Sequence, residues 1–543
     1  MSIYKEYCEE IFDESGKLKD LRVKYDPDFN FGYDVVDRYG KEEPYKTALV
    51  WCCPDGEERI FTFKEIMELS NKALNVFKSY GIKKGDKVMT VLKRRYEYWY
   101  VSVALHKLGA LIVPVTHMLT EEDLAYRIKS ANIKAAISVT DKEVCDKLKT
   151  VKNMCSELEV MFSVKKTDDC FVDFEKEVDN ASPVCDREEV YAADAMAIYF
   201  TSGTTGQPKG VIHDNTYPLA HIVTAKYWQG AEENGLHFTV AETGWAKTSW
   251  GKIYGQWLVG SAVMVFDFDN FDPRQIETII NRYNVTTFCA PPTIYRYMVM
   301  KNITDLKCLK KAVTAGEALG KDVFDKFRKL TGMDLIEGYG QTETTLLLAN
   351  FDDRIDKTGS MGKPSPMYDV KAVKEDGSFA GAGEVGEIVV IPKEGKKQTG
   401  VFCAYHENPQ MYEHVWRNGI YHTGDSARID EDGYFWFEGR IDDVIKTGGY
   451  RVGPFEIESV LSLHPAVVEC SVVGVPDPSR GQAIKAVAVL DPAYEASKEL
   501  QKEIKEFCNT RLAEYKWVRI VEFVKELPKT ISGKTIKSKI RHE

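Results

Sequence analysis

The stretch AMAIYFTSGTTGQPKG, residues 195–210, joins an apolar run to a loop that is rich in glycine and hydroxyl side chains. The run AMAIYF has the composition of a buried strand. Glycines let backbone N–H groups approach a ligand closely, hydroxyls donate hydrogen bonds to phosphate oxygens, and Lys209 adds a positive charge. A Walker A loop would need a glycine where Pro208 stands, so that motif is absent. The stretch therefore predicts a strand followed by a phosphate-binding loop of another kind.

Helices and strands alternate on either side of this loop. Asp272 is a predicted helix N-cap and Pro273 the first helical residue, followed by apolar residues at helical spacing, namely Ile276, Ile279, Ile280 and Tyr283. The β-branched run after them stops at Pro291 and Pro292 and predicts a strand. Residues 141–190 are rich in charge and predict solvated helices and loops. This alternation favours α/β layers with functional loops at the strand ends.

The pattern changes to short strands and turns after about residue 384, with EIVVI and then GYFWFEGR. Pro454 opens a predicted helix, and VVECSVVGV, residues 467–475, predicts a strand. We expect a domain boundary near Asp442, with a large domain over residues 1–441 and a small α+β domain over 442–543. The glycines of 381–386 fit G-x-G-x-x-G, but a strand-like run follows where a dinucleotide site needs a helix, so we interpret them as a turn.

Composition excludes several classes of protein. The chain has 543 residues, 44% of them hydrophobic, which suits a packed core rather than a fibre or a disordered chain. The net charge of -11 disfavours non-specific binding to nucleic acid or to anionic membranes. No apolar run is long enough to span a bilayer, and the N-terminus lacks the apolar segment of a secretion signal, so we expect a cytoplasmic protein. Twelve cysteines without C-x-x-C spacing predict reduced thiols, and the ten histidines show no zinc-site spacing.

Five motifs in this order resemble the superfamily of adenylate-forming enzymes, which includes acyl-CoA synthetases, adenylation domains and luciferases. They are the glycine-rich loop, Tyr339-Gly340-Gln341-Thr342-Glu343, Tyr421-His422-Thr423-Gly424-Asp425, Gly439-Arg440-Ile441-Asp442-Asp443 with the following Lys446 to Arg451, and Pro528 to Lys534. The sequence Glu242-Thr243-Gly244-Trp245 is similar to the medium-chain acyl-CoA synthetase branch.

The resemblance implies both a fold and a reaction. The fold would be a large N-terminal domain of two β-sheets interleaved with helices plus a small β-barrel, followed by a small mobile α+β domain. The reaction would activate a carboxylic acid with ATP to an acyl-adenylate and pyrophosphate, and then transfer the acyl group to CoA. ATP and CoA would be co-substrates, Mg²⁺ the cofactor and a small carboxylic acid the remaining partner; the oligomeric state stays open.

The residues are compatible with this chemistry, and the resemblance adds roles to them. Glu343 is a hard oxygen ligand suited to Mg²⁺, directly or through water. Asp425 has two oxygens for two ribose hydroxyls, although a turn after Gly424 would also explain it. The resemblance makes Lys534, Thr342 and Arg440 catalytic. It places ATP or AMP against Thr201, Ser202, Gly203, Thr204, Thr205, Gly206, Lys209, Gly316, Glu317, Ala318, Glu337, Gly338, Tyr339, Gly340, Gln341, Thr342, Asp425, Arg440, Arg451 and Lys534, with Tyr339 stacked on adenine.

The resemblance also suggests how the second step and the acyl pocket are built. Gly448, Gly449 and Tyr450 would bind CoA, and Asp442 would be the hinge about which the small domain turns. The acyl pocket would hold Trp245, Lys247, Trp250 and Gly340. Acetate-using relatives have a tryptophan at the place of Gly340, so glycine there predicts open space for a longer acid, of about three to six carbons. Alternatively, a positive φ could require the glycine.

Two other functions fit parts of the sequence. The chain could adenylate an amino acid for a separate carrier protein, or it could be an inactive nucleotide-binding protein. Intact Lys534, Glu343, Asp425 and Arg440 argue against the second.

Overall fold

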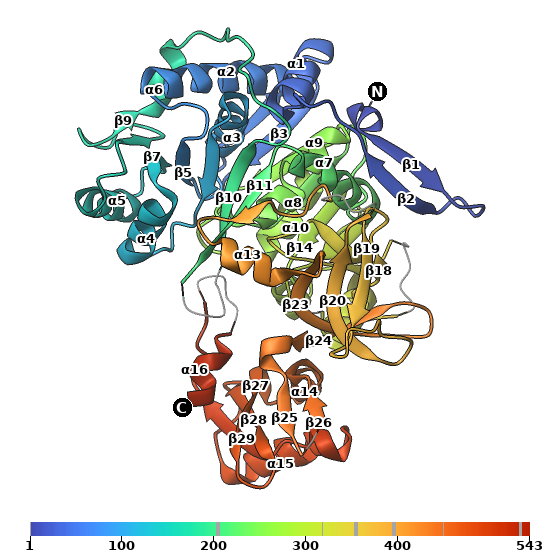
Figure 1. Ribbon diagram of the computed structural model, residues 1–543. Coiled ribbons are helices and arrows are strands. Elements are labelled where there is room, and N and C mark those ends of the chain that lie inside the picture. Colours follow the sequence, from blue (N-terminus) through green and yellow to red (C-terminus); the bar gives the residue numbers. More distant parts are fainter. Residues whose placement is uncertain are drawn as a thin grey trace.

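The computed structural model describes residues 2–201, 207–317, 319–351, 357–393, 398–448, 450–530 and 535–542. Its elements build two large sheets with helices between and around them, a third, antiparallel sheet, and a separate C-terminal sheet (Figure 1). The α/β class and the succession of layers predicted from the sequence are confirmed.

The first large sheet has the strand order β21-β11-β10-β6-β5-β7-β8-β9. The strands from β10 to β9 are parallel neighbours, whereas β11 and β21 run antiparallel at one edge. Their bounds are β5 Lys87–Val91, β6 Leu111–Pro114, β7 Ile133–Ser138, β8 Val160–Ser163, β9 Val172–Asp173, β10 Ala195–Thr201, β11 Lys209–Asp214 and β21 Ala404–Tyr405.

The second large sheet has the order β18-β17-β16-β15-β14-β12-β13-β3-β4. Its six strands from β16 to β3 are parallel neighbours, and antiparallel strands lie at both ends. Their bounds are β3 Thr47–Cys52, β4 Glu58–Thr62, β12 Leu236–Thr239, β13 Ala262–Phe266, β14 Thr287–Ala290, β15 Lys311–Thr314, β16 Leu335–Gly340, β17 Leu346–Ala349 and β18 Lys363–Pro364.

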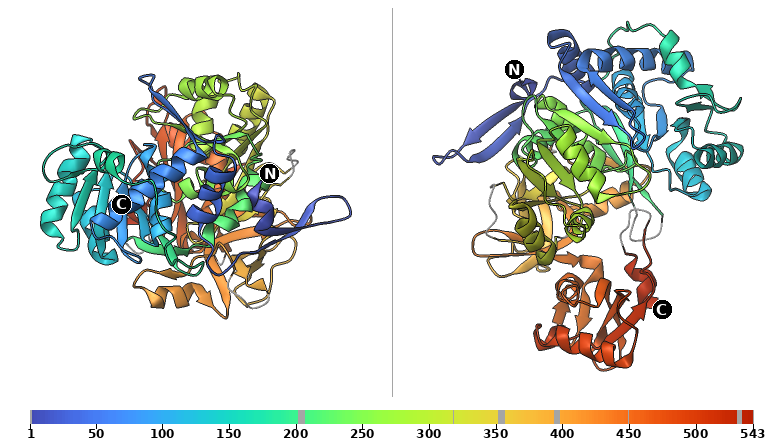
Figure 2. Two further views of the ribbon diagram at one scale, coloured as in Figure 1. Left: turned by 90° about the horizontal axis from the view of Figure 1, so that it is seen from above. Right: turned by 180° about the vertical axis from the view of Figure 1, so that it is seen from behind.

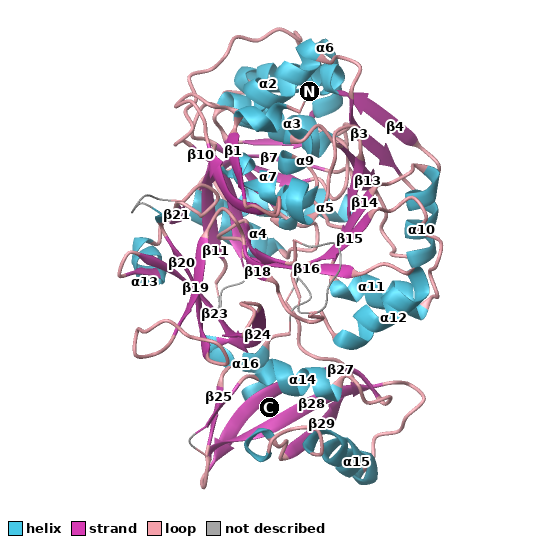
Figure 3. Ribbon diagram, turned by 90° about the vertical axis from the view of Figure 1, so that its right-hand side faces the viewer, coloured by secondary structure: helices cyan, strands magenta, loops and turns pink. Residues whose placement is uncertain are grey.

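Helices pack between these sheets and on their outer faces (Figure 3). One continuous apolar core joins both sheets, and a second apolar cluster covers the other face of the first sheet. Successive strand residues divide between the two cores, as Val88 and Met89 do, because side chains alternate across a strand. The helices are α1 Arg38–Glu42, α2 Phe63–Ser79, α3 Glu97–Leu108, α4 Glu121–Ala131, α5 Lys142–Met154, α6 Phe174–Asn180, α7 Tyr217–Ile222, α8 Lys247–Gly251, α9 Tyr254–Leu258, α10 Pro273–Arg282, α11 Pro292–Met300, α12 Lys321–Thr331 and α13 Pro409–Val415.

The helix predicted after Asp272 is present as α10. The Asp272 side chain accepts a hydrogen bond from the Arg274 backbone N–H, and Ile276 and Ile280 are fully buried. The predicted strand after it is β14. The charged segment 141–190 forms α5 and α6 as expected, but it also supplies β8 and β9 to the first sheet. Val160 to Ser163 make up only four residues, so their sequence carries little strand signal.

The third sheet is antiparallel and stands where the small barrel was predicted. Its path runs β19-β20-β23-β22, with β24 beside β23. Gly383 has φ +83° in the turn before β20, and Gly386 already belongs to that strand, so a strand and not the helix of a dinucleotide site follows the turn. The bounds are β19 Asp369–Val373, β20 Val385–Ile391, β22 Trp416–Arg417, β23 Ile420–Ile429 and β24 Phe435–Arg440.

The C-terminal elements form their own body (Figures 1 and 2). Their sheet has the order β26-β25-β28-β27, with β29 parallel to β28. Side chains of the sheet and of the helices beside it form a separate apolar core. The predicted helix at Pro454 is α14. The bounds are β25 Ile445–Thr447, β26 Tyr450–Val452, α14 Pro454–Leu461, β27 Val467–Asp477, β28 Gly481–Leu490, α15 Lys498–Asn509, β29 Ile520–Val524 and α16 Lys537–His542.

A two-stranded hairpin near the N-terminus, β1 Cys8–Phe12 and β2 Leu18–Val23, projects from the side of the large body (Figure 2). All twelve cysteines are free thiols. Within the described ranges, no helix has the length and apolarity to cross a bilayer.

Candidate active site

The predicted site residues gather where strands of three sheets end. Thr201 ends β10 and pairs with Lys209 on β11, so these two flank the glycine-rich loop. Gly316 follows β15, and residues 337–340 are the last of β16. In open parallel sheets, ligands bind outside the carboxyl ends of the strands, which is where these residues lie. Eight predicted residues fall outside the described ranges: Ser202, Gly203, Thr204, Thr205, Gly206, Ala318, Gly449 and Lys534.

Asp425 on β23 is the centre of a hydrogen-bond network. Its side chain is 9% exposed and accepts hydrogen bonds from the Tyr339 hydroxyl at 2.6 Å and from Gln341 Nε2 at 2.6 Å. Arg440 Nη1 lies 3.2 Å from Asp425 Oδ1. The Tyr421 hydroxyl donates to Gln341 Oε1 and fixes that amide. The network brings together four of the residues that the motifs singled out, from β16, the loop after it, β23 and β24.

Electrostatics keep the Arg440 guanidinium charged. Burial favours its neutral form, but the charges of Asp425 and Asp442 outweigh burial and raise the pKa of Arg440 further. Arg440 Nη2 is 3.5 Å from Asp442, the predicted hinge residue, which is 56% exposed. Gly424 has φ +72°, and a Cβ there would lie 2.8 Å from Arg440 Nη2. The glycine of this motif is therefore required both by its conformation and by the close approach of Arg440.

Burial raises the pKa of Tyr339 well above its usual value. The charge of Asp425, to which the Tyr339 hydroxyl donates, raises it further. The stacking of Tyr339 on adenine stays a prediction.

Glu337 precedes Tyr339 by two residues on β16 and lies close to the predicted adenine loop. Its side chain is buried, Oε1 accepts a hydrogen bond from the Leu319 backbone N–H at 3.3 Å, and Oε2 has no hydrogen-bond partner among the described residues. Burial raises the pKa of Glu337 to about 8, against the smaller effect of the Leu319 bond. Glu317, by contrast, is exposed and accepts from the Thr293 hydroxyl. Gly338 is packed against the Trp228 ring, where a Cβ would come within 2.6 Å.

A tyrosine that the sequence analysis missed holds the candidate metal ligand. The Tyr405 hydroxyl, on β21, donates to Glu343 Oε1 at 2.8 Å. Burial and the Glu343 charge raise the pKa of Tyr405, so its hydroxyl stays protonated. Lys209 Nζ lies 5.7 Å from the centroid of the same ring. None of the five motifs includes Tyr405. In the sequence, only its being an aromatic residue in a short strand could have pointed to it.

His213 is a second residue that the motifs did not include. On β11, its Nε2 donates to the Thr342 carbonyl oxygen at 2.7 Å, and its ring stacks on Tyr217 with 3.8 Å between centroids. It therefore ties the strand after the phosphate loop to the loop of Thr342 and Glu343.

The prediction of open space at Gly340 is wrong. A Cβ at Gly340 would lie 2.4 Å from the Thr345 carbonyl oxygen and 2.5 Å from the Trp250 ring. The φ of Gly340 is not positive either, so the alternative explanation also fails. The physical reason for the glycine is the close approach of Trp250, whose side chain is buried against the Trp228 and His221 rings. The Trp250 indole, from α8, thus occupies the space in which a side chain at position 340 would lie.

The other predicted acyl-pocket residues lie on the segment that ends in α8. Trp245 is half-buried, and Lys247 Nζ donates to the Ala315 carbonyl oxygen at 2.6 Å. Since Ala315 precedes Gly316, Lys247 links the acyl segment to the predicted adenine loop.

The predicted CoA residues lie in the C-terminal body. Gly448 has φ +56°, and its N–H donates to the Arg480 carbonyl oxygen. Tyr450 is 56% exposed, and its ring stacks on Tyr515 with 4.7 Å between centroids. Arg451 belongs to β26.

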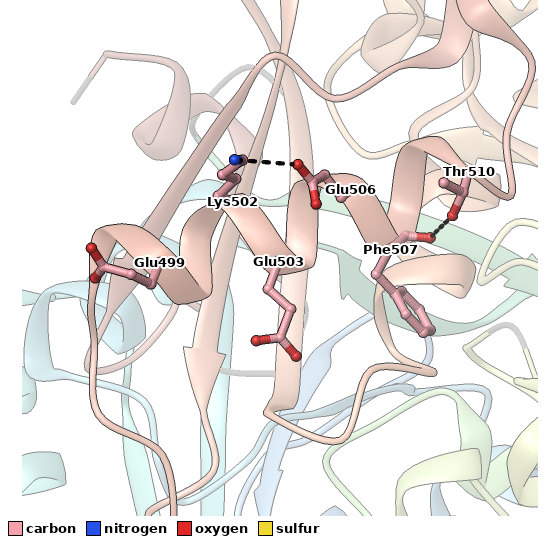
Figure 4. A pocket seen from close by; sticks show the side chains of 6 residues that line it. All are labelled: Glu499, Lys502, Glu503, Glu506, Phe507 and Thr510. Carbon is pink, nitrogen blue, oxygen red and sulfur yellow. Dashed lines mark hydrogen bonds and ion pairs between the residues drawn. The ribbon is translucent and has the colours of Figure 1, made fainter.

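Neither of two surface hollows coincides with this site. One, of about 470 Å³, lies along α15 and is lined by charged side chains, with Lys502 and Glu506 3.8 Å apart (Figure 4). The other, of about 430 Å³, lies near the N-terminus and includes Tyr33, Asp37 and Arg187. Among the described residues, no group of three His, Cys, Asp or Glu side chains is arranged to hold a metal ion.

Comparison with known proteins gives matches along the whole chain. Residues 36–393 match the model of the AMP-binding enzyme family, and residues 456–534 match that of the AMP-binding enzyme C-terminal domain. The chain is 37% identical to the human acyl-coenzyme A synthetase ACSM3, mitochondrial, over 96% of this chain and 91% of that protein. It is 38% identical to the Mus musculus acyl-coenzyme A synthetase ACSM5, mitochondrial, over 95% of this chain and 90% of that protein.

Solved structures agree with these matches. The crystal structure of the anthranilate CoA ligase AuaEII in complex with anthranoyl-AMP superposes with a TM-score of 0.86 at 28% identity, over 95% of this chain and 98% of that one. The Brucella canis acyl-CoA synthetase gives a TM-score of 0.72 at 28% identity, over 95% of both chains.

Proposed function

The chain belongs to the AMP-binding enzyme family, and we propose that it is an AMP-forming acyl-CoA synthetase for short- to medium-chain carboxylic acids. A carboxylate and ATP give an acyl-adenylate and pyrophosphate, and CoA then gives an acyl-CoA and AMP. The observation that supports this most is the network around Asp425, because it presents a carboxylate suited to ribose hydroxyls between a charged arginine and an anchored tyrosine.

The nucleotide would lie between the loop after β10 and this network. Thr201 and Lys209 flank the phosphate loop, Arg440 adds a permanent positive charge, and Glu337 and Gly316 would border the adenine. Positive charges placed where the α-phosphate gains negative charge stabilise the transition state without reorganisation. Lys534 would supply such a charge in the first step.

Glu343 is the residue we assign to Mg²⁺. The donor set fits, since a carboxylate whose position is fixed by the Tyr405 hydroxyl is a hard oxygen ligand. Mg²⁺, when bound with ATP, neutralises phosphate charge.

The acid would be short. Trp250 fills the space over Gly340 that a long chain would need, which favours short acids over palmitate. Trp245 and Lys247 lie on the same segment and would form the rest of the pocket.

We propose the division into residues 1–441 and 442–543, with Asp442 as hinge. Support comes from the separate apolar core of the C-terminal body and from the single 3-10 turn Ile441–Asp443 before it. Rotation at Asp442 would withdraw Lys534 from the site and bring Gly448, Gly449 and Tyr450 to it, a movement of the kind that lids make in other enzymes. Arg451 would contact phosphate in one of the two positions. A cytoplasmic location stays a prediction, since the two vertebrate relatives above are named as mitochondrial.

The test measures both steps over a panel of linear, branched and aromatic acids and the common amino acids. Acid-dependent ATP–pyrophosphate exchange, followed by CoA-dependent AMP release, is expected with short acids. Exchange with amino acids alone would favour adenylation for a carrier protein. No exchange with any acid would favour an inactive nucleotide-binding protein.

A further inference from the structure

A histidine–carboxylate pair, His117 and Glu242, lies outside the residues assigned so far. His117 Nδ1 is 3.1 Å from Glu242 Oε1, and the His117 backbone N–H donates to the same oxygen. The Thr116 hydroxyl donates to Glu242 Oε2 at 3.0 Å. The Glu242 side chain is 4% exposed, whereas that of His117 is 30% exposed. Both oxygens of the carboxylate are thus engaged, and the imidazole is partly exposed.

The pair joins the carboxyl ends of strands from both large sheets. His117 follows β6, which runs parallel to β10, so it leaves the first sheet at the same edge as Thr201. Glu242 follows β12 of the second sheet. The two loops touch through their backbones, because a Cβ on Gly244 would lie 2.3 Å from the Thr116 nitrogen. Trp245, of the proposed acyl pocket, is the next residue.

The groups around the pair keep Glu242 ionised. Burial would raise the pKa of Glu242, but the hydrogen bond and charge of His117, the charge of Arg94 and the Thr116 hydroxyl outweigh burial and lower it. Glu242 is therefore ionised, and a carboxylate only accepts hydrogen bonds. Nδ1 of His117 must therefore donate to Glu242, which leaves Nε2 as the ring nitrogen that Glu242 does not engage.

Other charged groups surround the ring at greater distance. Glu143 and Asp269 act on His117 electrostatically, and Lys147 Nζ lies 3.5 Å from its carbonyl oxygen. Lys93 pairs with Asp141 and Asp269. Other histidines near the sheets are closed to a substrate, since four of them are almost fully buried, namely His106, His213, His221 and His237.

We propose that His117, oriented by Glu242, is the catalytic base that takes the proton from the CoA thiol in the second step. This proposal rests on the proposed function. The S–H proton moves to Nε2, the thiolate sulfur forms a bond to the acyl carbonyl carbon, and the bond from that carbon to the AMP phosphate oxygen breaks. AMP leaves with the electron pair, and the proton passes from the imidazolium to solvent. A free thiol titrates near 8.5, so at neutral pH a base is needed.

The experiment separates the two steps in the full-length chain. H117Q keeps a side-chain donor toward Glu242 but has no basic nitrogen. Single-turnover conversion of acyl-adenylate by saturating CoA is expected to fall about 100-fold at pH 7, and ATP–pyrophosphate exchange to stay within threefold of wild type. The loss should shrink as pH rises, because the thiol then ionises unaided, and added imidazole should partly restore H117A. The matched control is H414Q, an exposed histidine on α13, with no expected change in either step.

Several results would overturn the proposal. Equal losses in both steps would show a structural role, and a raised KM for CoA with unchanged kcat would show only binding. An unaltered pH profile, or no effect of imidazole on H117A, would also exclude a base at this position. If wild type itself fails to form a thioester from acyl-adenylate and CoA, the proposed function fails, and not merely the assignment of His117.

Discussion

The nucleotide side of the candidate site is held by hydrogen bonds and charges, whereas its acyl side is held by close packing. Asp425 accepts from three side chains on the nucleotide side. On the acyl side, Trp250 and Trp228 fit by shape, with glycines at positions 338 and 340 where these two indoles approach the backbone. The two sides should therefore be sensitive to different substitutions. The nucleotide side should respond to changes in charge and hydrogen bonding, and the acyl side to changes in side-chain size.

The largest expected effect is on the polar side. D425A removes the acceptor for ribose hydroxyls and leaves Arg440, Tyr339 and Gln341 without their shared partner. Hydrogen bonds to charged groups contribute about 1.5–3 kcal/mol, so we expect kcat/KM for ATP–pyrophosphate exchange to fall about 100-fold. D432A, an exposed acid on the turn after β23, is the control. Exchange within twofold of wild type in D425A would place the ribose elsewhere.

The packed side should respond through stability. G340A places a methyl group against the Thr345 carbonyl oxygen and the Trp250 ring, so unfolding free energy should drop by about 2 kcal/mol, or about 30-fold in the folding equilibrium. Adding W250F should recover part of the loss, because the smaller ring makes room, and denaturant titration of the four proteins measures the coupling. Additive effects would contradict the contact between Gly340 and Trp250.

A polar contact at the edge of the nucleotide side should have a smaller effect. Y405F removes the hydroxyl that orients Glu343 but keeps the ring. We expect the Mg²⁺ concentration for half-maximal exchange to rise about tenfold, with little change in the value of kcat at saturating metal. An unchanged Mg²⁺ requirement would argue against Glu343 as a metal ligand.

Glu337, buried on β16, offers the smallest expected effect. Its folded-state pKa of about 8 is above that of the unfolded chain, so the folded state holds the proton more tightly and wild-type stability falls as pH rises through this range. E337Q has no such proton. Its stability relative to wild type should therefore grow by about 1 kcal/mol between pH 7 and pH 8, as measured by denaturant unfolding. A constant difference would mean that Glu337 is not protonated in the folded protein.

The sequence by itself determined several of the elements and most of the polar site. Local patterns sufficed for α10, because its cap, proline and apolar spacing lie within a dozen residues. The motifs identified Asp425, Tyr339, Gln341 and Arg440, since each carries its chemistry in its own side chain. The carboxyl end of the parallel strand β16 carries Tyr339 and Gln341 to the site, as the α/β pattern predicted, whereas Asp425 and Arg440 come from the antiparallel strands β23 and β24.

Only the tertiary structure decided what fills the space between them. Gly340 looked open in the sequence because nothing near it in the chain shows that Trp250, from another segment, lies against its backbone. Tyr405 and His213 reach the site through strands β21 and β11, and His117 meets Glu242 across 125 residues of chain. Contacts between remote segments depend on sheet order and on close packing of side chains, which short patterns of residues do not specify.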